Sequence, residues 1–305
     1  MIKKVFIFCE NTLNFIRFLF ELCQKKNFSN PIKKIHSGTI AILANGPSLK
    51  EDVLPYIENN SIFKNVDLAV MNFFALNELF FKIKPKHYFF ADTAFFYESC
   101  ACGQEERILT LFTAMQDKVD WKLTVYVPKE HYYDFLKYSK ITNEHINVVR
   151  MNLVTYRGYN RLRHFFFAKG LATPYMCNVL PFTIYTCINS GYSKIMLYGA
   201  DHTFFDICVN ENNQLCWKYS NFYDKQSSSL VPITTQYVES YKMSSFLHEM
   251  HIVFKAHDTM ANYANSLNVE IVNCTRNSFI DSYKRASLLD KIEHTDLEAL
   301  DRSNQ

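Results

Sequence analysis

Short apolar runs that alternate with helically patterned segments constrain this chain more than any other feature of its sequence. Residues 39–44 (Thr-Ile-Ala-Ile-Leu-Ala) form an apolar run that stops at Asn45-Gly46-Pro47-Ser48, and the spacing of residues 49–57 then predicts a helix. Strands that alternate with helices in this way form a mostly parallel sheet with helices on both faces. The sequence therefore predicts an α/β fold.

The same alternation continues along the chain. Further strands are expected at 67–71, 87–91, 123–127, 146–150, 194–198 and 269–273, and further helices at 76–81, near 104–115, and at 130–138, 175–190 and about 238–267. Two stretches, 151–174 and 199–235, break the rhythm and are expected to be irregular. A long insertion in a compact α/β domain is usually a lid or a binding loop, so we expect a lid over about 202–235.

Composition excludes several classes of protein. The chain has 305 residues, and its 33 Lys and Arg against 30 Asp and Glu give a net charge of only +3, which is no global footprint for nucleic acid. Its 9 Cys are odd in number and lack paired zinc-ligand spacing, which indicates reduced thiols in a cytoplasmic protein. Its 27 Phe and 19 Tyr are more than an ordinary globular chain has, and either core packing or stacking on a ligand could account for them.

The two ends differ from the middle. Residues 1–37 are expected to form an amphipathic helix and a linker, because Glu10 and Arg17 interrupt the apolar residues of 5–23 and rule out a membrane-spanning segment. Such a basic-flanked segment (residues 1–34) could lie on a membrane surface, on its own domain or on a second subunit of a homo-oligomer, and these alternatives stay open. The main domain is expected over 38–288, followed by a polar tail at 289–305.

Polar residues follow four of the expected strands. Asn45, Asn72, Asp92 and Asp201 each stand at the carboxyl end of a buried run, and parallel strands bring these ends to one edge of the sheet. In the turn after the first strand, Gly46 allows close approach of a ligand, and Ser48 is suited to cap the next helix. This turn is neither an ATPase nor a dinucleotide fingerprint.

Candidate proton acceptors and phosphate ligands lie in the second half of the chain. His202, His248, His251 and His257 are candidate general bases, with a satisfied core histidine as the alternative for each. Tyr219 and Tyr223 could donate hydrogen bonds to a phosphate or simply pack a lid. No Asp-x-Asp or His-Glu-x-x-His motif is present, so we expect neither a metal nor a cofactor.

Several of these segments together resemble a known family, the bacterial lipooligosaccharide sialyltransferases and related proteins of surface-polysaccharide clusters. The segment Ile42-Leu43-Ala44-Asn45-Gly46-Pro47-Ser48-Leu49 is similar to the family's opening strand and turn, and Met71-Asn72-Phe73-Phe74 to its second strand. Tyr175-Met176-Cys177, residues 191–201 ending in Gly199-Ala200-Asp201, and Val269–Asn273 with Asn277-Ser278 resemble its later elements. The resemblance covers roughly residues 39–285.

The resemblance implies a Rossmann-like domain, a metal-independent variant of the GT-A type with an inserted lid, that transfers sialic acid from CMP-sialic acid with inversion. Asn45, Gly46, Pro47 and Ser48 would form the donor-binding turn, with Asn72 and Asp92 at the same edge and Thr173 near the donor carboxylate. The general base would fall at His251, or in a shifted register at His257 or His202, beside Asp201, and Tyr219 and Tyr223 would stabilise the departing phosphate.

The resemblance leaves the substrates open. Family members continue the Gly-x-Asp motif with Phe-Tyr, where this chain has His202-Thr203, so the donor is either sialic acid or another CMP-activated 2-keto sugar acid. The acceptor is expected to be a hydroxyl of a bacterial surface glycan or glycolipid, and the protein to be cytoplasmic or peripheral on the inner face of the cytoplasmic membrane. A Mg²⁺-dependent pyrophosphokinase or phosphotransferase, and an inactive nucleotide-binding scaffold, remain as alternatives.

Overall fold

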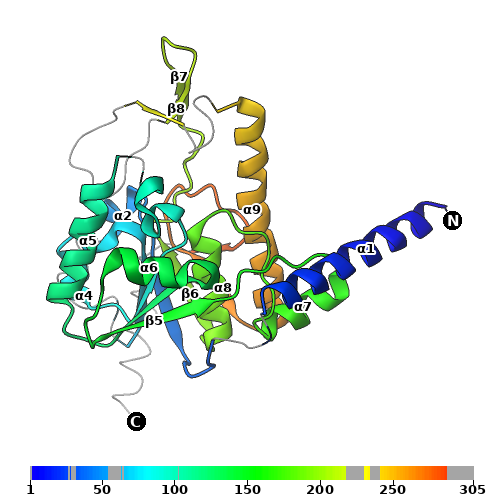
Figure 1. Cartoon of the computed structure of the whole chain (residues 1–305), viewed down its shortest axis with the longest axis horizontal. Helices are drawn as coiled ribbons and strands as arrows, with labels where there is room; N and C mark the ends of the chain where they lie inside the picture. The colour runs from blue at the N-terminus through cyan, green and yellow to red at the C-terminus, as the bar shows by residue number, and fades with distance from the viewer. Residues whose placement is uncertain are drawn as a thin grey trace.

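The computed structural model describes residues 2–26, 28, 32–53, 63, 65–101, 103–217, 230–233 and 241–286. Its centre is an eight-stranded sheet flanked by helices (Figure 1). The strands are β1 (Thr39–Leu43), β2 (Asp67–Met71), β3 (His87–Phe89), β4 (Leu123–Pro128), β5 (Ile146–Met151), β6 (Lys194–Tyr198), β10 (Glu270–Asn273) and β11 (Lys284–Arg285). Each pairs with its neighbours in parallel, so the predicted α/β fold with a mostly parallel sheet is confirmed and is consistent with a Rossmann-like fold.

The order of the strands creates a reversal at the middle of the sheet. The spatial order is β11-β10-β6-β1-β2-β3-β4-β5. The chain first builds outward from β1 to β5 and then returns to place β6 on the other side of β1. In open α/β sheets, such a reversal opens a crevice beyond the carboxyl ends of the two central strands.

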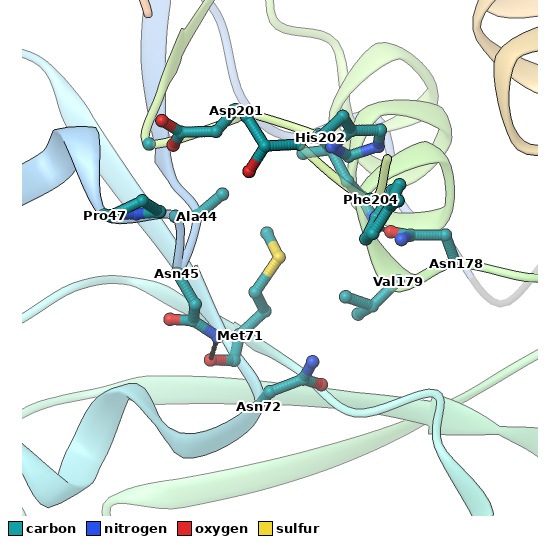
Figure 2. Close-up of a pocket in the computed structure, with 14 residues that line it drawn as sticks. Ala44, Asn45, Pro47, Met71, Asn72, Asn178, Val179, Asp201, His202 and Phe204 are labelled. Atoms are coloured by element: carbon teal, nitrogen blue, oxygen red, sulfur yellow. Dashed lines mark hydrogen bonds between the residues drawn. The ribbon is translucent and has the colours of Figure 1, made fainter. Parts of the chain in front are cut away.

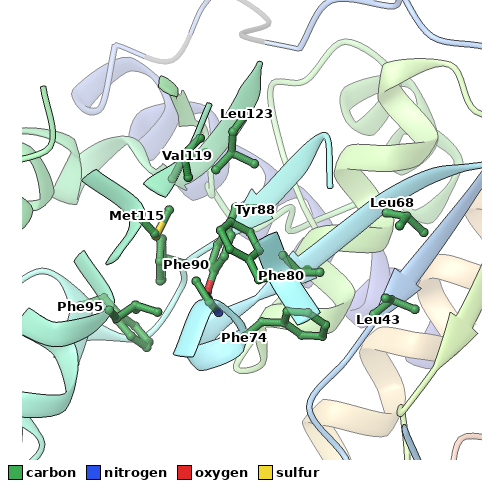
Figure 3. Packing of buried hydrophobic residues seen from close by; sticks show 14 of the residues in the cluster. Leu43, Leu68, Phe74, Phe80, Tyr88, Phe90, Phe95, Met115, Val119 and Leu123 are labelled. Carbon is green, nitrogen blue, oxygen red and sulfur yellow. Dashed lines mark hydrogen bonds between the residues drawn. The ribbon is translucent and has the colours of Figure 1, made fainter. Parts of the chain in front are cut away.

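Helices cover both faces because successive strand residues point to opposite sides. In β1, Ala41 and Leu43 enter one buried cluster, and Ile40 and Ile42 enter the other. The first cluster, seen in Figure 3, is covered by α2 (Ser48–Asp52), α4 (Leu79–Ile83), α5 (Glu105–Lys118) and α6 (Tyr132–Ser139). The second is covered by α1 (Ile2–Gln24), α7 (Asn160–Ala168), α8 (Val179–Ser190) and α9 (Met243–Ser266). Short 3-10 turns follow β2 (η1, Asn72–Leu76), β3 (η2, Thr93–Phe95; η3, Glu98–Cys100) and β4 (η4, Lys129–His131).

Two predicted segments were wrong in detail. The helix expected at 175–190 begins only at Val179, because the Asn178 side chain accepts a hydrogen bond from the Leu180 N–H and caps the helix there. The stretch 151–174 was expected to be irregular but contains α7, whose Phe167 is buried against the second cluster. Of the helix expected at 49–57, residues 48–52 are helical and 54–62 lie outside the described residues.

The segment expected to be a lid contains a small antiparallel sheet of its own. Strands β7 (Ile207–Val209), β8 (Leu215–Trp217) and β9 (Val231–Pro232) pair in the order β7-β8-β9, and Leu215 and Ile233 pack with Phe246 and Met250 of α9. The small sheet therefore packs against the amino-terminal half of α9 (Figure 1). Tyr219 and Tyr223 lie outside the described residues, as does the tail expected at 289–305.

The amphipathic helix expected at 5–23 is present as α1. Phe15 and Phe18 of this helix pack against Tyr156 and Phe166, which flank and belong to α7. Among the described residues, no helix has both the length and the apolar character needed to cross a bilayer.

Candidate functional site

A pocket lies at the reversal of strand order, where the loops after β1, β2 and β6 meet the start of α8 (Figure 2). Its empty space is about 480 Å³, a volume that includes open solvent. The lining residues are Ala44, Asn45, Gly46, Pro47, Met71, Asn72, Asn178, Val179, Leu180, Gly199, Asp201, His202, Thr203 and Phe204. The pocket thus brings together Asn45, Asn72, Asp201 and His202 from three separate strand ends.

Asn45 is held in one orientation and keeps an unused acceptor. Its side-chain Nδ2 donates to the main-chain oxygen of Met71 at 3.1 Å, which fixes the amide. The residue is only 9% exposed, and its Oδ1 has no hydrogen-bond partner among the residues that the structure describes. A buried polar atom without a partner costs free energy, so a donor from a bound ligand would stabilise it.

Gly46 lies where no larger residue fits. Its N–H donates to the Gly199 oxygen at 2.8 Å, and a Cβ at this position would stand 1.8 Å from Asp201 Oδ2. That carboxylate accepts hydrogen bonds from the Ser48 N–H at 3.3 Å and from the Ser48 hydroxyl at 2.8 Å. Asp201 therefore connects the loop after β6 to the turn after β1. The prediction that Ser48 caps the next helix was wrong, because Pro47 is the N-cap of α2 and the Ser48 hydroxyl bonds Asp201 instead. Ser48 does not line the pocket.

Asn72 adds a second unused acceptor. It adopts a left-handed backbone with φ of 51°, which asparagine tolerates better than most residues but which still stores strain. Its Oδ1 is buried and, within the described part of the chain, has no hydrogen-bond partner. Strained residues persist where the surrounding structure fixes them, and here the Tyr88 hydroxyl donates to the Asn72 main-chain oxygen.

His202 is the histidine that lines the pocket, and it is linked to a second one behind it. The Nε2 atoms of His202 and His257 are 3.1 Å apart, and His257 Nδ1 is 2.9 Å from the Tyr283 hydroxyl. Burial lowers the pKa of His202 to about 3 and holds the pKa of His257 well below its ordinary value, with the neighbouring imidazole adding to the latter effect. Both rings are therefore neutral at physiological pH.

Two neutral imidazoles that meet through Nε2 share one proton between these atoms. When His202 donates, His257 accepts at Nε2 and donates from Nδ1 to the Tyr283 oxygen. In that arrangement His202 Nδ1, which makes no hydrogen bond within the described part of the chain, is an unprotonated base.

The other predicted site residues lie elsewhere. Asp92 is exposed, and its carboxylate accepts from the Ala94 N–H at 3.0 Å. Thr173 is buried and forms a bridge with Thr155 away from the pocket lining. His248 and His251 are exposed on α9 and are not among the residues that line the pocket.

The pocket lining also includes Met71, Asn178, Val179 and Phe204, which the sequence patterns did not predict as site residues. Asn178 carried a signal, because an asparagine directly before an apolar helical run is typical of a helix cap. The apolar residues carried none, since an apolar side chain in a pocket cannot be distinguished by pattern from one in the core. Within the described residues, no three His, Cys, Asp or Glu side chains are grouped so that they could hold a metal ion.

No protein-family model matches the chain, and a search of curated proteins finds no match.

Proposed function

We propose that the pocket binds the nucleotide of a CMP-activated 2-keto sugar acid and that the protein is an inverting glycosyltransferase acting on a hydroxyl of a bacterial surface glycan. The observation that carries this proposal is the pair of buried, unpartnered oxygens, Asn45 Oδ1 and Asn72 Oδ1, at the carboxyl ends of adjacent strands. Both are acceptors, and a cytidine offers donors in its exocyclic amine and ribose hydroxyls. The Asn-Gly-Pro-Ser turn, which resembles the family's donor-binding turn, supports the same assignment.

The linked histidines His202 and His257 support the proposed transfer reaction. In the proposed reaction, the acceptor hydroxyl attacks the anomeric carbon, the bond from that carbon to the phosphate oxygen breaks, and CMP leaves with the electron pair. The hydroxyl proton passes to His202 Nδ1, while the bond to His257 holds the ring in the required tautomer. We therefore assign the base to His202, and the fold to a metal-independent variant of the GT-A type.

A binding panel tests the nucleotide assignment. Thermal stability of the full chain is measured with CMP, UDP, GDP and ATP, each in EDTA and in Mg²⁺, since a ligand that binds the folded state raises its stability. We expect CMP to stabilise the protein in EDTA. Preference for ATP or GDP only with Mg²⁺ would contradict the proposal and favour a phosphotransferase, and CMP binding without any turnover of CMP-sugar acids would favour a scaffold.

Variants of the two asparagines sharpen the panel. Asn45→Ala and Asn72→Ala should each weaken CMP binding by about 1 kcal/mol, roughly fivefold, because each removes one acceptor. Asn147→Ala, at an exposed position of β5, is the matched control and should leave binding unchanged.

Two histidine variants separate the candidate bases. His202→Gln should abolish transfer and keep CMP binding, whereas His251→Gln should retain transfer. The reverse pattern would return the base to His251, the position implied by the family resemblance.

A further inference from the structure

The outer face of α1 carries large apolar side chains that nothing in the described part of the chain covers. Phe6, Leu13 and Phe20 recur every seven residues, which places them in one stripe along the helix, and Phe6 and Phe20 are 69% and 63% exposed. Val5 and Ile16 flank the stripe and are also exposed. The opposite side of the helix holds Phe15, Phe18 and Leu22 against the domain. The helix thus has two apolar faces. The inner face packs against the domain, and the outer face is exposed.

The body of the protein fixes the direction of the exposed stripe. α1 lies along α7 and extends outward from the domain, with the N-terminus at its far end (Figure 1). Rings of Tyr156 and Phe166 pack on Phe18 with centroids 5.0 Å away in both cases, and Arg157 pairs with Glu21 at 3.2 Å. Because the inner face is anchored, the stripe stays turned away from the domain.

Basic residues outnumber acidic residues in the segments that form and adjoin α1. Residues 1–37 contain seven Lys and Arg and two Glu, a charge of +5, although the whole chain carries only +3. Residues 151–178, which include α7, contain Arg157, Arg161, Arg163 and Lys169 and no acidic residue. A second copy of the chain docked on the stripe would set these like charges against each other. An anionic surface complements them.

We propose that the outer face of α1 binds a lipid bilayer that contains anionic lipids. Phe6, Leu13 and Phe20 enter the boundary between headgroups and acyl chains. Lys3 and Arg17 reach the lipid phosphates along the flank of the helix. α1 then lies in the plane of the membrane, with the domain on the side of the helix that faces away from the bilayer. This inference does not depend on the reaction proposed for the pocket.

Vesicle flotation of the full chain tests the proposal. We expect the protein to float with vesicles of phosphatidylcholine and phosphatidylglycerol at about 3:1, to float poorly with phosphatidylcholine alone, and to be released as salt rises. The double variant F6E/F20E should lose binding by roughly tenfold or more, because it removes inserted apolar surface. Lys3→Gln and Arg17→Gln should each lower binding roughly fivefold.

Leu109→Glu is the matched control, since Leu109 is 46% exposed on α5, distant in sequence from this surface, and its variant should float like the unmodified protein. Circular dichroism of each variant separates loss of binding from loss of folding. The proposal is overturned if the unmodified chain does not bind anionic vesicles, or if F6E/F20E binds them equally well. It is also overturned if the chain is a dimer that F6E/F20E converts to a monomer with no lipid bound in either state, which would make a second copy the occupant.

Discussion

Gly46 is the residue at which the pocket tolerates least change. Its Cα faces the carboxylate of Asp201 so closely that a methyl group would stand 2.5 Å from the Gly199 oxygen as well as 1.8 Å from Asp201 Oδ2. The same carboxylate holds Ser48. The turn after β1 and the loop after β6 therefore form one unit, and a change in either should disturb the other.

Gly46→Ala should lower the free energy of unfolding by about 3 kcal/mol, because overpacking is added to the loss of hydrogen bonds to the Asp201 carboxylate. Urea denaturation measures the change. The comparison is Gly103→Ala, where nothing lies within 4 Å of the new Cβ and only a left-handed backbone is penalised, at about 1 kcal/mol. Equal losses for the two variants would show that the contact with Asp201 is not what excludes a side chain at Gly46.

The placement of polar residues at strand ends could be predicted from the sequence, but the direction of their side chains could not. Asn45, Asn72 and Asp201 meet at one pocket because parallel strands share an edge, and this needs only the strand pattern. Asp92 also follows a strand, yet its carboxylate turns back to the Ala94 N–H. The link between His202 and His257 joins residues 55 positions apart and depends on how α9 packs, which no local pattern encodes.

At the scale of elements, the buried strands followed from the sequence because apolar runs bounded by turns are distinctive. The strands at 67–71 and 194–198 match their predicted bounds. Helix α7 was missed although its run is amphipathic, with Phe167 fully buried beside exposed Phe165 and half-buried Phe166. Its position is fixed by packing against α1 and the second buried cluster.

Asn178 sets the start of α8 and lines the pocket at the same time. Asn178→Ala should cost about 1 kcal/mol of stability, because the Leu180 N–H loses its capping acceptor. Asn178→Asp keeps an acceptor and should cost much less. Chemical denaturation of the two variants checks this, and equal losses would show that the cap contributes nothing to α8.

Helix α1 should be able to leave the domain without unfolding it, since its contacts are confined to its inner face. Phe18 is 0% exposed in this contact, so Phe18→Ala should speed hydrogen exchange across α1 and leave exchange in the central strands unchanged. Phe20→Ala removes an exposed ring from the same helix and should have no such effect. Faster exchange in β1 for Phe18→Ala would show instead that α1 and the sheet unfold together.

The whole molecule carries neutral histidines at both ends of its sheet. His202 and His257 lie beyond the carboxyl ends, and His87 opens β3 at the amino end, where its Nε2 is 2.8 Å from the Tyr192 hydroxyl. Burial lowers the pKa of His87 to about 3, as it does for His202. The ordinary value is 6.5, so in the window between 6.5 and 3 the unfolded chain binds protons that the folded chain does not.

Stability should therefore rise with pH through this window and fall on acidification below 6.5. His87 and His202 should each remove about 1 kcal/mol when the pH drops from about 7.5 to about 5.5, and His257, whose pKa is also lowered by burial, should add to this loss. Burial alone would raise the pKa of Asp67, but hydrogen bonds from Lys86 and Tyr192 and the charge of Lys86 lower it overall. The stability that this carboxylate contributes is lost only when the pH falls below about 3.8, outside this range. Urea unfolding at the two pH values measures the difference. His87→Gln should shrink this difference by about 1 kcal/mol, whatever the variant costs at neutral pH, because the difference between the two pH values counts only protons taken up on unfolding. An unchanged difference would mean that His87 is protonated in the folded protein.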